Sequence, residues 1–98
     1  NMEQHSYFVY IMANASGSAL YIGFSGALER RVAQHKTKAL PGFSRRYNIT
    51  KLVYFEELSS PQEAIAREKV IKGLTRKKKM QLIKKHNPTF HDLLPLSS

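Results

Sequence analysis

Residues 7–24, YFVYIMANASGSALYIGF, decide the fold of this chain. From Tyr7 to Ala13 successive residues alternate between two faces, which is the pattern of a β-strand. Asn14 to Ser18 are small and turn-forming residues, and the strand pattern resumes from Ala19 to Phe24. Two strands joined by such a short turn predict a β-hairpin.

Helix and strand signals alternate along the rest of the chain. The expected elements are a helix from about Ala27 to Lys38, a loop from Leu40 to Asn48, a strand from Lys51 to Glu57, a helix ending near Lys72 and a helix from Thr75 to His86. The helix ending near Lys72 has the clearest start, because Ser60 can cap it and Pro61 fits its first position. The order β-β-α-β-α-α predicts an α+β domain, in which helices flank a three-stranded antiparallel sheet.

A chain of 98 residues predicts one domain, because a domain takes roughly 100 to 200 residues. We place this domain over residues 7–94, between an N-terminal tail of residues 1–6 and a C-terminal tail of residues 95–98. Asn1 precedes Met2 and is interpreted as a residue left by cloning. The absence of cysteine excludes disulfides and thiolate metal sites. No apolar run approaches the roughly 20 residues of a membrane span, and no signal peptide precedes the first strand, so we expect no membrane partner and a cytoplasmic location.

The formal net charge of +9 indicates a polyanionic partner. Residues 30–51 carry seven Lys or Arg and no acid, and residues 67–85 carry nine Lys or Arg against Glu68 alone. Charge runs are often only a solvated surface, but two segments nearly free of acids favour nucleic acid. A membrane surface is less favoured, because neither Trp nor a long apolar helix face accompanies the charges. The lysines assigned to nucleic-acid contact are Lys69, Lys72, Lys77 and Lys78.

The segment from Phe43 to Tyr47 adds a second feature of nucleic-acid binding. It places Arg45 and Arg46 between two aromatic residues. Cations next to aromatic rings suit a nucleic-acid backbone and an unstacked base. Many loops have a similar composition, so this segment supports the charge argument without carrying it alone.

Glu68 is an acid at an inward-facing position of its expected helix. It shares the apolar stripe of Ala64 and Ile71, where a carboxylate is costly unless a cation accompanies it. One candidate cation is Lys72 at i+4, although such a pair is worth only about 0.2–0.5 kcal/mol. The other candidate is a metal ion. We favour the metal ion, because an ion pair with Lys72 does not explain why the acid lies at an inward-facing position.

Arg31 and His35 lie four residues apart and therefore share one helix face. The planar guanidinium of Arg31 suits two phosphate oxygens, and its alternative role is a salt bridge with Glu56 or Glu57. His35 has two equally weighted roles, as a site residue or as a partly buried histidine bonded to the backbone.

Tyr10 and Tyr21, on the two strands of the hairpin, also have two interpretations. In a sheet, tyrosine is most often a half-buried aromatic residue with a packing role. Alternatively, one phenol activates or positions an attacking water. To act as a base near neutral pH, the phenol needs a pKa about three units below its ordinary value, which corresponds to about 4 kcal/mol of free energy. The alternative is a concerted proton transfer. Arg31, nearby lysines and a divalent ion would favour the phenolate.

The stretch from Phe8 to His35 resembles the opening of the GIY-YIG nuclease family. Tyr21-Ile22-Gly23 matches the second tripeptide of that family letter for letter, and Phe8-Val9-Tyr10 corresponds to the first, with Phe8 in place of its glycine. Further matches follow in family order at Arg31, His35 and Glu68. The chain is most similar to the small single-domain members, over nearly its whole length.

The resemblance implies roles for these residues. Tyr10 would be the base and Tyr21 its positioning partner, Arg31 would bind the scissile phosphate, and Glu68 would hold Mg²⁺ or Mn²⁺. Gly23 would keep the floor of the site clear for the substrate backbone. His35 corresponds to a position where family members carry His or Tyr. Asn87, which precedes Pro88, is left out of the site, because His91 stands at the place where larger members often carry asparagine.

The function implied is a metal-dependent endonuclease that hydrolyses DNA phosphodiester bonds by water attack. The alternative is a nucleic-acid-binding module that keeps the fold and does not cut. Little in the chain favours sequence readout, so we expect specificity for DNA structure, such as branched, flapped or damaged DNA, or specificity supplied by a partner protein. DNA repair is the expected context.

Overall fold

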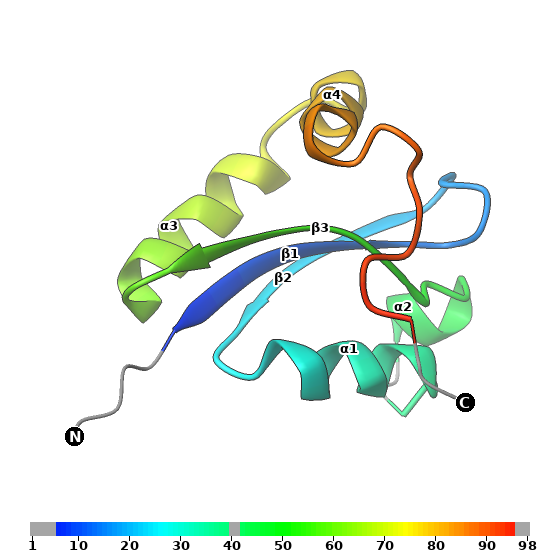
Figure 1. Cartoon of the computed structure of the whole chain (residues 1–98), viewed down its shortest axis with the longest axis horizontal. Helices are drawn as coiled ribbons and strands as arrows, with labels where there is room; N and C mark the ends of the chain where they lie inside the picture. Colours follow the sequence, from blue (N-terminus) through cyan, green and yellow to red (C-terminus); the bar gives the residue numbers. More distant parts are fainter. Residues whose placement is uncertain (1–5, 40–41, 96–98) are drawn as a thin grey trace.

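The computed structural model describes residues 6–39 and 42–95, in which three strands form one antiparallel sheet. The strands are β1 (Tyr7–Ala13), β2 (Leu20–Ser25) and β3 (Lys51–Leu58), in the order β2-β1-β3. The hairpin predicted from the sequence is therefore the β1–β2 pair, and β1 is the central strand (Figure 1).

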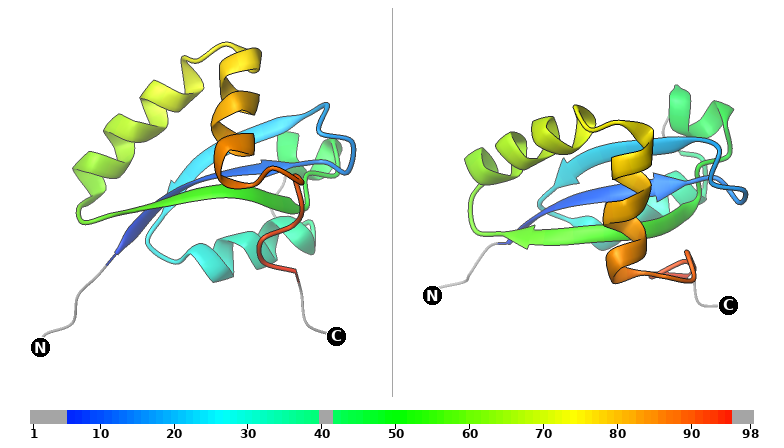
Figure 2. Two further views of the ribbon diagram at one scale, coloured as in Figure 1. Left: turned by 45° about the horizontal axis from the view of Figure 1, so that its top comes forward. Right: turned by 90° about the horizontal axis from the view of Figure 1, so that it is seen from above.

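Helices lie on both faces of the sheet, as Figures 1 and 2 show. The helices are α1 (Leu28–Lys36), α2 (Phe43–Arg46), α3 (Pro61–Lys72) and α4 (Arg76–His86). α1 covers one face, and α3 and α4 cover the other. The predicted α+β class and its order of major elements are confirmed. Within the described residues, no helix is both long and apolar enough to cross a bilayer.

Two details differ from the sequence prediction. The first helix was expected to reach Lys38 and ends at Lys36, because Lys38 adopts a left-handed backbone conformation with φ of 59°. The segment expected to be a loop contains α2, a single turn of helix. Leu40 and Pro41, at the start of that segment, lie outside the described residues.

Both faces of β1 are buried because this strand runs through the middle of the sheet. Val9 and Ile11 face α3 and α4, where they pack in one cluster with Ile71. Tyr10 and Met12 face α1 and pack in a second cluster. The alternation seen in the sequence thus separates two cores, and it sends the tyrosine of β1 toward α1.

Side-chain caps fix the starts of α3, as predicted, and of α4. The Ser60 Oγ accepts a hydrogen bond from the Glu63 N–H at 3.2 Å, and the Thr75 Oγ1 accepts one from the Lys78 N–H at 3.2 Å. The Glu63 carboxylate accepts in return from the N–H of Ser59 at 3.2 Å. These bonds satisfy backbone donors that the first turn of a helix leaves without partners.

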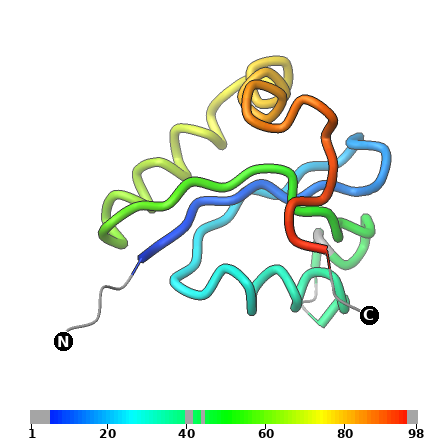
Figure 3. Tube along the Cα trace, in the orientation of Figure 1, coloured from blue at the N-terminus to red at the C-terminus, as the bar shows by residue number. Residues whose placement is uncertain are grey.

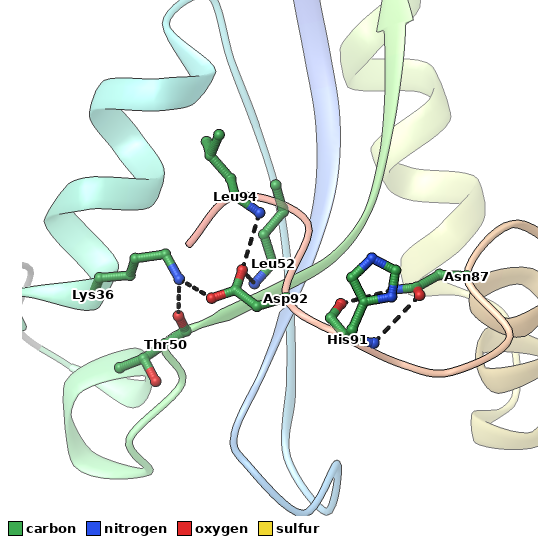
Figure 4. Close-up of polar contacts among 7 residues, drawn as sticks. All are labelled: Lys36, Thr50, Leu52, Asn87, His91, Asp92 and Leu94. Atoms are coloured by element: carbon green, nitrogen blue, oxygen red, sulfur yellow. Dashed lines mark hydrogen bonds and ion pairs between the residues drawn. The ribbon is translucent and has the colours of Figure 1, made fainter. Parts of the chain in front are cut away.

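The segment after α4 covers part of the outer edge of β3 (Figure 3). The Leu93 N–H donates to the Leu52 carbonyl at 2.8 Å, and the Asp92 carboxylate accepts from the Leu52 N–H at 3.1 Å. Asp92 also pairs with Lys36 of α1 (Figure 4). The fully buried Asn87 donates to the carbonyls of Val53 and His91 at 3.0 and 2.9 Å. Asn87 is therefore a structural residue, in agreement with its exclusion from the predicted site.

Candidate active site

Three aromatic side chains meet on the face of the sheet that α1 covers, at β1 and β2. The Tyr10 hydroxyl lies 3.2 Å from Nε2 of His35, and both side chains are 1% exposed. The ring of Tyr21 lies 4.9 Å from that of His35 and 6.3 Å from that of Tyr10, centroid to centroid. Tyr21 remains partly exposed. The structure thus brings two predicted strand residues into contact with a predicted helix residue.

Gly23 allows this arrangement. It is paired with Tyr10 across the β1–β2 ladder, so the two residues point to the same face. A Cβ atom at Gly23 would lie 2.9 Å from the Tyr10 hydroxyl oxygen and 3.0 Å from a ring carbon of Tyr21. The phenol of Tyr10 therefore extends from β1 across Gly23. The space above Gly23 was expected to admit the substrate backbone, but it is filled by the two tyrosine rings.

We predict that Gly23→Ala displaces the Tyr10 ring. Overpacking of this kind costs about 1–3 kcal/mol of the free energy of unfolding. Gly73→Ala is the matched control, because a Cβ there would lie 3.5 Å from its nearest neighbour, an ordinary contact. Urea unfolding of both variants measures the cost. Equal stabilities for the two variants would show that the contact at Gly23 is relaxed without strain.

Burial sets the protonation of the Tyr10–His35 pair. Burial raises the pKa of Tyr10 well above its ordinary value; the nearby Tyr21 and Glu68 add to the rise, and the Arg31 cation only partly opposes it. Burial and then the Arg31 cation lower the pKa of His35 to about 4. Both groups are therefore neutral near neutral pH. A base at Tyr10 would require the opposite shift of its pKa, so these surroundings weigh against the role that the sequence resemblance implied for Tyr10.

The shifted pKa of His35 predicts an acid-sensitive fold. Between about pH 6.5 and pH 4 the His35 side chain is protonated in the unfolded chain but stays neutral in the folded protein. The contribution is complete above about pH 6.5 and is lost as the pH falls toward 4, on the order of 1–3 kcal/mol. Glu56 and Asp92 also have lowered pKa values, and their contributions are lost as the pH falls from the ordinary carboxyl pKa through the lowered folded value, mostly in more acidic solution than the window of His35.

Urea unfolding as a function of pH, for the parent and for His35→Gln, checks this expectation. The variant should lose less stability than the parent between about pH 6.5 and 4.5. His91→Gln, at an exposed histidine, should follow the parent. Identical pH profiles for the parent and His35→Gln would contradict the assignment.

Arg31 is a cation without a carboxylate partner among the described residues. The acids considered as its partners are engaged elsewhere. Glu56 accepts two hydrogen bonds from Nε of Arg67, at 2.8 and 3.1 Å, and Glu57 accepts one from Ser6. The salt-bridge alternative for Arg31 is therefore wrong. Its charge acts instead on Tyr10 and His35, which places the guanidinium beside the aromatic cluster.

Glu68 approaches the same cluster from α3. Its side chain is 16% exposed and forms an i,i+4 ion pair with Lys72 at 3.2 Å, which was the less favoured alternative in the sequence. Its charge still contributes to the raised pKa of Tyr10, so the carboxylate lies near the phenol. α3 thus brings an acid within electrostatic range of Tyr10, the residue on which the charge of Arg31 from α1 also acts.

The donors at this site fit a hard divalent cation. Carboxylate oxygens are ligands of the type that Mg²⁺ and Mn²⁺ prefer. Within the described part of the chain no three Asp, Glu, His or Cys side chains gather into a metal cluster. Mg²⁺ is often held by one or two carboxylates together with substrate phosphates. Glu68 therefore fits as the single protein carboxylate of a site that a substrate would complete.

The remaining predicted residues lie outside this cluster, on the exposed surfaces of three helices. Arg45 and Arg46 are on α2, Lys69 is on α3, and Lys77 and Lys78 are in the first turn of α4. Lys72 is also exposed, although it is paired with Glu68. Arg76 and Lys79, which line a groove opposite α2, were not among the predicted residues. The signal for them is the first turn of α4, which is entirely basic.

Residues 6–88 match the sequence pattern of the family described as GIY-YIG catalytic domain. The chain belongs to the GIY-YIG family. A UPF0213 protein of Clostridium perfringens is 40% identical over 76 residues, which cover 78% of this chain and 81% of that protein. A UPF0213 protein of Haloquadratum walsbyi is 37% identical over 76 residues, which cover 78% and 84%. The solution NMR structure of a UPF0213 protein from Bacillus halodurans superimposes with a TM-score of 0.57 and 27% identity, over 95% of this chain and 98% of that one.

Membership of the GIY-YIG family confirms the predicted family and indicates a nuclease domain acting on nucleic acid. The replacement of the first glycine of the family pattern by Phe8 leaves the strand intact. Phe8 packs partly buried beside α1, with its ring edge-on to Phe55 at 6.1 Å. Its side chain is two residues from Tyr10 on the same face, so the substitution changes the packing next to the site and not the pairing of β1.

Proposed function

We propose that this GIY-YIG protein is a divalent-metal-dependent endonuclease that hydrolyses DNA phosphodiester bonds. The observation that carries the proposal is that, among the described residues, the charges of Arg31, which has no carboxylate partner, and of Glu68 both act on Tyr10 in the aromatic cluster. Phosphoryl transfer needs charge stabilisation and positioning more than covalent chemistry from the protein. These residues supply both.

Arg31 is the phosphate ligand in this proposal. Its five N–H donors form a planar fork that matches two phosphate oxygens. Since no carboxylate among the described residues neutralises it, its charge is available for the substrate. It would also stabilise the negative charge that develops on the phosphoryl group in the transition state.

We assign the contact with the attacking water to Tyr21 and not to Tyr10. Tyr10 is 1% exposed and its hydroxyl is bonded to His35, whereas Tyr21 is partly exposed. Tyr10 and His35 would then hold the Tyr21 ring in place.

This assignment predicts that Tyr21→Phe slows cutting more than Tyr10→Phe does. Loss of a general base typically costs about 10²–10⁴-fold. We therefore expect Tyr21→Phe to lower the cutting rate by roughly 10²-fold. Tyr10→Phe should lower it less, because Tyr10 only positions the Tyr21 ring. Single-turnover cutting rates measure both. A larger loss for Tyr10→Phe would return the role of base to Tyr10.

Glu68 would hold the metal ion. When bound there, a divalent ion supplies Lewis-acid stabilisation of the phosphoryl oxygens. Lys72 and Arg31 repel a cation in the free protein, and a bound phosphate offsets their charge. Metal and DNA are therefore expected to bind with positive coupling, each raising the affinity of the other.

The basic surface of α4 supports a polyanionic substrate. Residues 76–79 are all Arg or Lys, at the end of a helix where the macrodipole favours acids. Four cations there do not help the helix itself. An external polyanion provides the compensation that the fold lacks.

A non-catalytic DNA-binding module is the second candidate. It is favoured by the ion pair of Lys72 with Glu68, which satisfies the carboxylate without a metal. Incubation of the purified protein with plasmid, flapped, branched and single-stranded DNAs, with and without Mn²⁺, separates the two. The endonuclease cuts at least one of these DNAs only with the ion, and the binding module shifts them in a gel without cutting any.

A further inference from the structure

A groove lies at β2, between α2 and the start of α4. Its volume is about 410 Å³, within the range of small-molecule sites. Phe43 of α2 and Tyr47, the residue that follows this helix, form part of its lining, and Arg76 and Lys79 of α4 form another part. Its floor includes Leu20 and Ile22 of β2. The groove therefore combines aromatic rings, cations and the edge strand of the sheet.

Phe43 and Tyr47 stand four residues apart on one helical turn, and their rings lie 4.6 Å apart between centroids. They shield each other, yet they are 49% and 44% exposed. The guanidinium of Arg46 lies 5.6 Å from the Tyr47 ring centroid, so a cation already accompanies one ring. Two half-exposed rings among cations match the sites on which unpaired bases stack.

The chemistry around the rings selects a nucleic acid over an acidic protein segment. An aromatic face binds every base by stacking, and the nearby cations track the phosphates. Arg76 uses one N–H to bond the Gly17 carbonyl, and four of its five donors remain for a ligand. An acidic peptide would use the cations but would gain little from flat rings.

The groove follows the same strand as the candidate active site. Tyr21 lies between Leu20 and Ile22 in sequence and points to the other face of β2. Leu20 is three residues from Gly23, a distance of roughly 10 Å along a strand. That length equals about three nucleotide steps of a B-DNA strand at 3.4 Å each. Because β2 is an edge strand, a DNA strand that passes around this edge from a phosphate at Arg31 could place a nearby base in the groove.

We propose that Phe43 and Tyr47 form a stacking platform for an unpaired base, and that the DNA recognised by this protein carries single-stranded nucleotides next to the phosphate held by Arg31. The inference rests on the proposed function for the identity of that phosphate. It deepens that function by naming the class of substrate, a junction of single-stranded and double-stranded DNA. The platform itself is tested by binding, without cutting.

The test compares a duplex with a single-stranded overhang and a blunt duplex of the same length, by fluorescence anisotropy in EDTA. A variant carrying Phe43→Leu and Tyr47→Leu keeps apolar side chains on α2 and removes both ring faces. Phe55→Ala is the matched control, because Phe55 is 44% exposed on β3, the opposite edge strand. Thermal unfolding of each variant checks that the fold is retained.

The parent is expected to prefer the overhang, and the leucine variant to bind it roughly 5- to 150-fold more weakly. Binding to the blunt duplex and the slope of log affinity against log salt should stay the same, because no charge is removed. A 2-aminopurine in the overhang should lose fluorescence on binding the parent and not the leucine variant. Phe55→Ala should behave as the parent.

Two results would overturn the platform: equal affinity of the parent and the leucine variant for the overhang, or an equal loss on both DNAs. If the platform effect appears and the parent cuts no DNA with Mn²⁺, the platform stands and the nuclease proposal fails. If the parent cuts DNA and the leucine variant binds and cuts overhang DNA as the parent does, the nuclease proposal stands and the platform fails.

Discussion

Replacing Glu68 with glutamine is expected to remove cutting while leaving DNA binding intact. The change removes the Glu68 carboxylate, whose charge acts on Tyr10, at nearly constant volume. Metal stabilisation of a phosphoryl group is worth several kcal/mol, which corresponds to a loss of about a thousandfold or more in the cutting rate. Binding in metal-free buffer should hold or rise slightly, because a negative charge leaves a basic surface.

The measurement is the single-turnover cutting rate with Mn²⁺, together with affinity for the same DNA in EDTA. Glu29→Gln is the matched control, since Glu29 is an exposed acid in the first turn of α1. This control should cut as the parent does. Cutting by Glu68→Gln at the parent's rate would remove Glu68 from the catalytic machinery.

The neighbouring arginines of α1 are expected to differ sharply. Arg31→Ala should lose roughly 10³-fold or more in cutting rate, the size of effect seen when an arginine that stabilises a transferring phosphoryl group is removed. Arg30→Ala should lose little, because Arg30 is exposed, whereas Arg31 lies beside Tyr10 and His35. The two variants remove the same charge one residue apart, so each is the control of the other.

Single-turnover rates and affinities for both arginine variants test this contrast. Arg31→Lys adds a second measure, because lysine keeps the charge and loses the planar fork. We expect it to recover only part of the rate. Equal losses for Arg30→Ala and Arg31→Ala would indicate a general effect of positive charge and not a phosphate ligand at Arg31.

The periodic features of the sequence predicted the fold because they report burial directly. The alternation in β1 separates the two cores of the domain, and the caps at Ser60 and Thr75 fix the starts of α3 and α4. The four-residue spacing of Arg31 and His35 placed both beside the tyrosines. In each of these cases, a local pattern determines which side of an element a residue occupies.

Features that depend on long-range contacts could not be predicted in the same way. The space above Gly23 was expected to be open, and only the register of β1 with β2 reveals that the Tyr10 phenol fills it. The burial of Tyr10, and hence the direction of its pKa shift, follows from packing against α1. The sequence allowed an ion pair between Glu56 and Arg31, but in the structure Glu56 pairs with Arg67.

The central claim is that Glu68 and a DNA phosphate together hold the divalent ion. Electron paramagnetic resonance of free Mn²⁺ tests it most directly. Tyr21→Phe serves as the parent because it keeps Glu68 while slowing cutting, and DNA alone gives the background. We predict weak Mn²⁺ uptake by Tyr21→Phe without DNA, and an additional tightly bound ion per complex with DNA. The additional ion should be absent when Glu68→Gln is combined with Tyr21→Phe. Equal uptake by both proteins with DNA, or tight uptake by Tyr21→Phe without DNA, would contradict the account.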